Sequence, residues 1–133
     1  RFSVRETKIA IVADLGTLQR LPLIVGQGHA RELAFTGKDL SAERAERMGL
    51  VNEVFTDATA LAAGAAALAA EIAGNAPLTV RGVKRVLDFG TGRRVADGLD
   101  YVAAWNSAFL ASEDLGEALG SFLEKRPAKF LGR

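Results

Sequence analysis

The sequence contains no cysteine and only one histidine, His29, among its 133 residues. The lack of cysteine excludes disulfides, thiolate nucleophiles and cysteine-based metal sites, and one histidine cannot form a zinc site by itself. Long apolar runs are also missing, since no stretch approaches the roughly 20 residues that a membrane helix requires, and no signal segment opens the chain. We therefore expect no metal site and no membrane partner.

The charges are evenly balanced. Seventeen Lys and Arg face sixteen Asp and Glu, which leaves a formal net charge of +1, and the basic residues are scattered along the chain. No basic patch for nucleic acid is therefore predicted. A hydrophobic content of 49% suits one globular domain with a core. Because the chain opens at Arg1 with a strand-like sequence and its single methionine is Met48, we expect the C-terminal part of a longer protein.

The first segment of the chain predicts a strand followed by a short helix. Residues 2–4 alternate apolar and polar side chains, which is typical of a strand with one buried face, and Glu6 follows at its end. Asp14 precedes apolar residues at helical spacing, which predicts a helix over about 15–21 that ends at Pro22. Asp14 would then be the N-cap of this helix.

Two more short helices and a strand are predicted before residue 56. Residues 27–35 form a helical pattern closed by Gly37, and Ser41 is placed to cap a helix that Gly49 ends. The apolar residues within 50–55 are typical of a short strand. The first 56 residues thus mix strands and helices.

From Asp57 onward the pattern is helical throughout. An alanine-rich stretch with one apolar stripe is followed by two further helical stretches and by a helix that Ser112 caps. The predicted helices cover residues 57–75, 78–89, 95–111 and a stretch from 113 to about 126. The third of them carries apolar residues on one side and Tyr101 and Trp105 on another. Two such faces predict a helix that is buried or contacts a partner.

Glu6 and Asp14 are the most informative pair of acids. On one continuous strand they would lie about 26 Å apart at roughly 3.3 Å per residue, too far to act together. Only a chain that turns back between Thr7 and Ala13 could bring both carboxylates to one pocket. The alternative is a solvated Glu at a strand end and an Asp that caps a helix, where the cap stabilises by about 1 kcal/mol. Residue spacing leaves both interpretations open.

Other candidate motifs favour structural roles. The glycines at 16, 26 and 28 fit no phosphate-loop pattern, and turns or close packing account for them. His29 has no evident acidic partner to orient it as a base. The spacing of Tyr101 and Trp105 is that of a packed pair. Four basic residues near the C-terminus could hold a phosphate, although a basic last turn is also usual in helices: Lys125, Arg126, Lys129 and Arg133.

Three motifs together resemble a known family. They are ARELAFTG at residues 30–37, AERMGLVNEV at 45–54 and FLEKR at 122–126. In this order they are similar to the C-terminal half of the enoyl-CoA hydratase/isomerase family, the crotonase superfamily. The resemblance implies an α/β fold, the crotonase-like (ClpP/crotonase) ββα spiral. Residues 1–56 would then be the last part of that core, and residues 57–133 a helical region that assembles trimers or hexamers.

The segment from Glu6 to Asp14, continued as ADLGTLQRLP, is similar to the dienoyl-CoA isomerases of this family. The resemblance implies that both acids are catalytic, one accepting and one donating a proton as a 3,5-dienoyl thioester becomes its 2,4-isomer. Such a pair works if burial and repulsion keep one acid protonated. An enoyl-CoA hydratase, which needs Glu6 alone, and a non-catalytic fragment that binds CoA or assembles subunits are the two alternatives.

The resemblance also implies how the substrate is held. Phe122 and Lys125 match positions of the FLEKR motif that contact the CoA nucleotide in this family. Coenzyme A would enter only as part of the acyl-CoA substrate, and no metal or redox cofactor is expected. The oxyanion hole that stabilises the thioester enolate would lie before Arg1. The pattern leaves the cellular compartment open, with the cytoplasm expected if the protein is bacterial.

Overall fold

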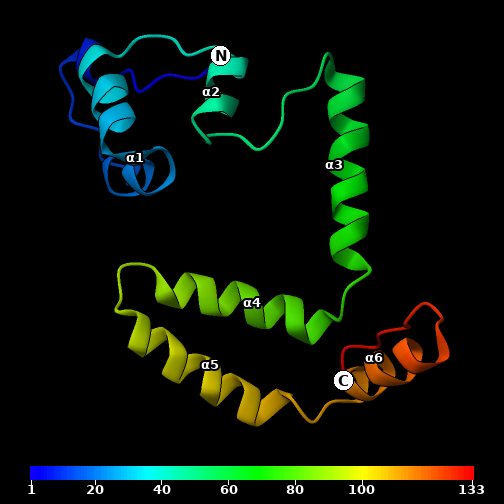
Figure 1. Cartoon of the computed structure of the whole chain (residues 1–133). Helices are drawn as coiled ribbons and strands as arrows, with labels where there is room; N and C mark the ends of the chain where they lie inside the picture. Colours follow the sequence, from blue (N-terminus) through cyan, green and yellow to red (C-terminus); the bar gives the residue numbers. More distant parts are fainter. The chain divides into compact units, whose positions relative to one another are not determined.

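The computed structural model describes all 133 residues and consists of helices joined by loops (Figure 1). The chain divides into two compact units, Arg1–Ala62 and Ala63–Arg133. The helices are a 3₁₀ helix η1 (Glu6–Ile9) and six α-helices: α1 (Thr17–Thr36), α2 (Ala42–Arg47), α3 (Ala58–Ala73), α4 (Pro77–Gly90), α5 (Val95–Phe109) and α6 (Glu113–Glu124). No single helix is long and apolar enough to cross a membrane, although α3 and α4, bent by 106° at their break, pass that test as a pair.

The two predicted strands are not formed. Phe2 makes only an isolated antiparallel bridge with Leu40, through two backbone hydrogen bonds of 3.0 and 2.8 Å. Residues 50–55 adopt bends and irregular structure. A strand requires a neighbour with which to share a ladder of hydrogen bonds, and within this chain the only partner for residues 2–4 is the single bridge at Leu40. The prediction of strands at 2–4 and 50–55 was therefore wrong.

The predicted end of the first helix, at Pro22, was also wrong. Helix α1 continues through Pro22 and turns instead at Gly26, where φ of 77° and ψ of 164° interrupt the helix. Only glycine adopts this conformation without strain, so the glycine sets the bend while the proline sits inside the first helical segment. The second segment ends at Gly37, as the sequence predicts, and Gly37 has a φ of 56°.

The remaining helix predictions are confirmed. The Ser41 hydroxyl accepts a hydrogen bond from the Arg44 backbone at the start of α2, and the Ser112 hydroxyl accepts one from the Leu115 backbone at the start of α6. Helices α3, α4 and α5 cover the three stretches predicted after Asp57. The boundary between the two units falls inside α3, and the division into a core of residues 1–56 and an assembly region of residues 57–133 stays a prediction.

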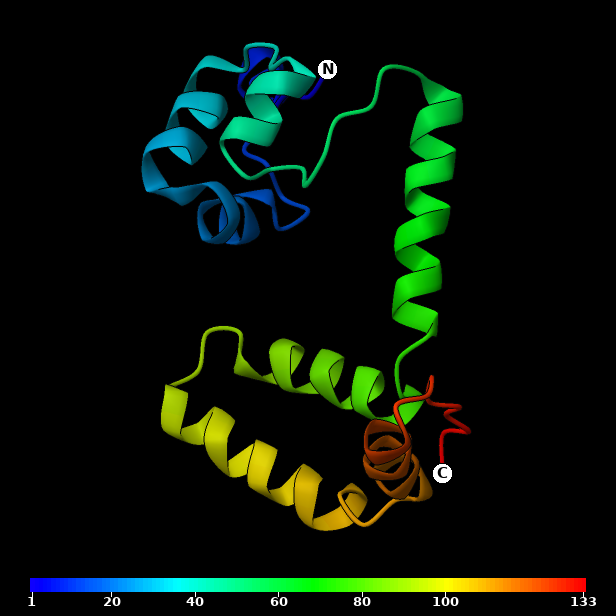
Figure 2. The ribbon, with the colours of Figure 1, turned by 45° about the vertical axis from the view of Figure 1, so that its right-hand side comes forward.

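The two units differ in what they bury. In Arg1–Ala62 the core is built around Leu33 and Leu40, which are 2% and 1% exposed. In Ala63–Arg133 helices α4 and α5 run side by side (Figure 2), with Trp105 of α5 lying directly over Gly82 of α4. The rings of Phe89 and Tyr101 stack between the same helices, with centroids 4.4 Å apart. Packing of an aromatic ring on a glycine allows two helices to approach closely.

Candidate active site

The chain reverses between Glu6 and Asp14. Helix η1 spans Glu6–Ile9, and its C-cap residue Ala10 adopts the left-handed conformation with φ of 60°. The Ile11 backbone N–H then donates to the Glu6 carbonyl at 3.0 Å. Asp14 lies only three positions after Ile11, and an extended chain spans at most about 3.5 Å per residue. The eight-residue separation therefore corresponds to a turn and not to 26 Å of strand.

Both carboxylates of this turn are free of structural partners. Glu6 is half-buried and Asp14 is exposed, and neither side chain forms a hydrogen bond or an ion pair. Helix α1 begins at Thr17 with Gly16 as its N-cap, so Asp14 caps nothing. The interpretation of Asp14 as a helix cap and that of Glu6 as a strand end were thus both wrong. The fold uses neither acid, which leaves both available for chemistry.

Helix α1 fixes the position of the turn. The Thr7 hydroxyl donates a hydrogen bond to the Ala34 carbonyl in the last turn of α1. At the end of the helix, the Cβ that any other residue would add at Gly37 would lie 3.0 Å from the Lys8 side chain and 3.3 Å from the Val4 carbonyl. The glycine of the ARELAFTG motif therefore permits close contact between η1 and α1, as well as a positive φ.

The glutamate of the same motif holds α1 to the start of α2. The Glu32 carboxylate forms an ion pair with the Lys38 ammonium and accepts two hydrogen bonds from Arg44 Nη2 at 2.7 and 2.9 Å. These partners, with Lys38 first, lower the pKa of Glu32 from 4.5 to about 2. Glu32 also lies 3.7 Å from His29 Nδ1, so His29 does have an acidic neighbour one helical turn away.

The second pair of candidate residues lies at the end of α6. Phe122 is 81% exposed. Lys125 is the C-cap of α6 in the left-handed conformation, with φ of 53°, and its backbone N–H donates to the Phe122 carbonyl. The Lys125 ammonium forms no ion pair. The structure therefore presents an exposed ring and a free positive charge on the same helix end, and their role toward CoA stays a prediction.

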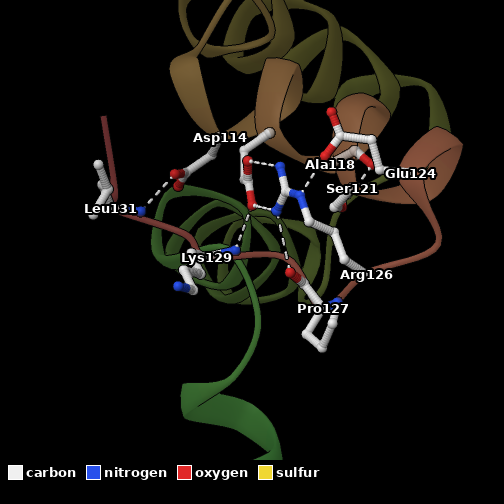
Figure 3. Close-up of polar contacts among 9 residues, drawn as sticks. Asp114, Ala118, Ser121, Glu124, Arg126, Pro127, Lys129 and Leu131 are labelled. Carbon is white, nitrogen blue, oxygen red and sulfur yellow. Dashed lines mark hydrogen bonds and ion pairs between the residues drawn. The ribbon is translucent and has the colours of Figure 1, made fainter.

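A network that the sequence did not predict anchors the segment after α6 (Figure 3). The Asp114 carboxylate, 3% exposed, accepts hydrogen bonds from the backbones of Leu131 and Gly132 at 2.7 and 2.9 Å. Glu117 binds the Arg126 guanidinium through both oxygens, at 2.6 and 2.9 Å, and accepts the Lys129 backbone N–H at 2.7 Å.

Arg126, together with the Lys129 backbone, lowers the pKa of Glu117 from 4.5 to about 2. Acidic residues in the first two turns of α6 are visible in the sequence. Their contacts with residues 126–132, which lie 9 to 18 positions further along the chain, carry no local signal. Arg126 thus has a structural role, whereas the side chain of its neighbour Lys125 has no ion-pair partner.

The structure offers a cavity and no metal site. Unit Ala63–Arg133 contains a mostly apolar cavity of about 350 Å³ lined by residues of α4, α5 and α6, among them Val86, Val102, Trp105 and Phe109. No group of three or more His, Asp or Glu side chains is arranged to hold a metal ion.

Solved structures establish the fold. The chain aligns with an enoyl-CoA hydratase from Bacillus anthracis with a TM-score of 0.92, 34% identity and coverage of 97% of this chain and 50% of that one. A Mycobacterium marinum enoyl-CoA hydratase aligns with a TM-score of 0.91 and 37% identity over 99% of this chain and 52% of that one. The chain therefore has the crotonase-like fold, of which it forms the last part and the C-terminal helices.

Sequence comparison then gives the family. The chain belongs to the enoyl-CoA hydratase/isomerase family, whose sequence model matches residues 1–133. It is 51% identical over 130 residues to a mitochondrial Δ(3,5)-Δ(2,4)-dienoyl-CoA isomerase of Dictyostelium discoideum, covering 98% of this chain and 44% of that protein. A peroxisomal Δ(3,5)-Δ(2,4)-dienoyl-CoA isomerase of Arabidopsis thaliana is 49% identical over 129 residues, 97% of this chain and 46% of that protein. The chain thus spans less than half the length of these relatives.

Proposed function

We propose that the protein is an acyl-CoA double-bond isomerase that converts a 3,5-dienoyl-CoA to a 2,4-dienoyl-CoA. The observation that carries this proposal is the turn that joins Glu6 to Asp14 and leaves both carboxylates without a structural partner. The similarity to proteins named dienoyl-CoA isomerase, at 51% and 49% identity, supports it. The substrate is an acyl-CoA thioester, and no further cofactor takes part.

The reaction requires two proton transfers. One carboxylate removes a proton from the α-carbon of the thioester, and the other donates a proton at the far end of the conjugated system. The donor must carry a proton when the substrate is bound, and either acid can take that role.

Phe122 and Lys125 serve the nucleotide end of CoA in this proposal. The exposed ring offers a flat apolar surface for the adenine, and the free ammonium offers a point charge for a phosphate. The oxyanion of the enolate intermediate needs backbone N–H donors. We assign these donors to the part of the full-length protein that precedes this chain in its relatives.

The test is Asp14→Asn in the full-length protein, with 3,5-dienoyl-CoA as substrate. Loss of one of two proton-transfer groups lowers kcat about 10²- to 10⁴-fold. Asp100→Asn is the matched control, because Asp100 is exposed and has no polar partner. A kcat of the Asp14→Asn enzyme within twofold of that of the parent would contradict the proposal.

The second candidate is an enoyl-CoA hydratase that uses Glu6 without Asp14. The alignment with the Bacillus anthracis hydratase at a TM-score of 0.92 favours it. Water addition to a 2-enoyl-CoA separates the two candidates. A hydratase adds water rapidly in both the parent and the Asp14→Asn protein, whereas an isomerase of the proposed kind adds little and loses isomerisation in the variant.

A further inference from the structure

We propose that Thr7 is a positioning residue, whose hydroxyl holds the turn between Glu6 and Asp14 against the end of α1. The inference rests on the proposed function for its catalytic consequence. That Thr7 holds the turn in place is argued from contacts within Arg1–Ala62 alone. Thr7 directly follows Glu6, and its hydroxyl donates to a carbonyl 27 residues further along the chain.

The acceptor of this hydrogen bond is a helix-end carbonyl. The last four carbonyls of an α-helix have no partner of the usual kind within the helix. At the end of α1 the Leu33 carbonyl accepts the Gly37 N–H, but the Lys38 N–H, which would have reached Ala34, donates to the Thr36 hydroxyl at 3.3 Å. The Ala34 carbonyl is thereby left to Thr7, in a residue that is only 8% exposed.

The hydrogen bond closes a ring of chain segments that runs past Asp14 and ends beside Glu6. From Thr7 the ring follows the turn to Asp14 and the first segment of α1. It then reverses at Gly26 and returns along the second segment to Ala34. Asp14 precedes one end of α1 and Glu6 is bound beside the other end. The bend at Gly26 and the Thr7 hydroxyl therefore hold the backbone at Glu6 in place relative to the backbone at Asp14.

The turn needs such support because its own backbone does not favour it. Ala10 is one of two residues other than glycine with a positive φ in this chain. A side chain in the left-handed region crowds the following carbonyl, so alanine adopts it only where the surroundings impose it. Ala13 packs into the core beside residues of α1 and Lys8 packs on Gly37, and the Thr7 hydroxyl makes the one hydrogen bond between this turn and α1.

The test compares Thr7→Val with Thr7→Ser in the full-length protein. Valine keeps the shape and removes the hydroxyl, while serine restores it. With Thr7→Val we expect backbone amide hydrogen exchange across residues 6–14 to rise about fivefold, the effect of one lost hydrogen bond. We also expect kcat for 3,5-dienoyl-CoA to fall about tenfold or more with KM within twofold, because small misplacements of catalytic groups are costly.

Thr7→Ser should recover at least half of both losses. Thr91→Val is the matched control, since the Thr91 hydroxyl donates to the Leu87 carbonyl in α4, away from either acid. Exchange across residues 6–14 that is equal in Thr7→Val and the parent would overturn the inference, as would a Thr7→Ser enzyme as slow as Thr7→Val. If the parent protein lacks dienoyl isomerase activity, the proposed function fails, and the exchange measurement alone decides the role of Thr7.

Discussion

Every buried apolar side chain of the chain lies between Val4 and Ala45, whereas the buried side chains of Ala63–Arg133 belong to Asp114 and Ser121. The first unit is thus held by an apolar core. The second is held by carboxylates, by hydrogen bonds to the backbone and by aromatic rings packed on glycine and on one another. Apolar residues are plentiful in the second unit, but Leu68, Leu119 and many others remain exposed. In Arg1–Ala62 regularly spaced apolar residues form a core. In Ala63–Arg133 such residues form helix faces that no other part of the unit covers.

The difference between the two units should be largest when one leucine is removed from each. Leu33→Ala should lower the free energy of unfolding by about 3 kcal/mol, because it leaves a cavity in a packed core. Leu68→Ala in α3 should lower it by less than about 1 kcal/mol, since Leu68 is 53% exposed. Urea denaturation followed by far-ultraviolet circular dichroism measures both. Equal losses would mean that the second unit depends on apolar burial as much as the first.

A substitution at Gly82 tests the packing that replaces an apolar core in the second unit. A Cβ at this position would lie 2.5 Å from Trp105 Nε1, so Gly82→Ala forces α4 and α5 apart and should cost about 2 kcal/mol. Trp105 is the only tryptophan, and its fluorescence reports this contact directly. Gly98→Ala is the control: it meets no atom within 4 Å and should stabilise by about 0.5 to 1 kcal/mol. A stable Gly82→Ala protein with unchanged fluorescence contradicts the prediction.

The smallest expected effect is a response to acid that both regions share. Glu32 and Glu117 each have a pKa lowered from 4.5 to about 2 in the folded protein. Their ion pairs therefore stabilise the fold fully above about pH 5, and this contribution is lost as the pH falls from about 4.5 to about 2. Both side chains remain accessible to water, so the effect is modest.

Glu117→Gln should flatten the acid response of the Trp105 fluorescence while leaving that of residues 1–62 intact. Glu32→Gln should do the reverse, with the first unit followed through its backbone amides by nuclear magnetic resonance. If either variant changes both responses equally, the two ion-pair clusters are coupled and the two regions are not held independently.

The sequence predicted the parts of the fold that depend on local chemistry. Ser41, Ser112 and Gly37 cap or end helices in the expected way, because a hydroxyl at a helix start and a glycine at a helix end act within a few residues. The strands at 2–4 and 50–55 were wrong, since a strand depends on a partner that local spacing does not supply. The first helix was predicted to end at Pro22, whereas the interruption lies at Gly26. Glycines occur at 16, 26 and 28, and no local pattern shows which of them interrupts a helix.

The candidate site was predicted in its residues but not in its geometry. Glu6 and Asp14 were selected, and the turn between them was stated only as a condition. That turn depends on Thr7 reaching Ala34 and on Lys8 packing on Gly37, contacts between residues far apart in sequence. The network of Asp114 and Glu117 was missed for the same reason. Long-range polar contacts leave no periodic pattern in a sequence.

The hydrogen bond from Thr7 to Ala34 also orders events in time. Its two ends are separated by 27 residues, and its acceptor reaches its position only when the last turn of α1 has formed. Closing a loop of this length is slow compared with the growth of a helix, since chain entropy opposes it. We therefore expect the turn that carries Glu6 and leads to Asp14 to be among the last parts of its unit to become fixed, after the helices of that unit have formed.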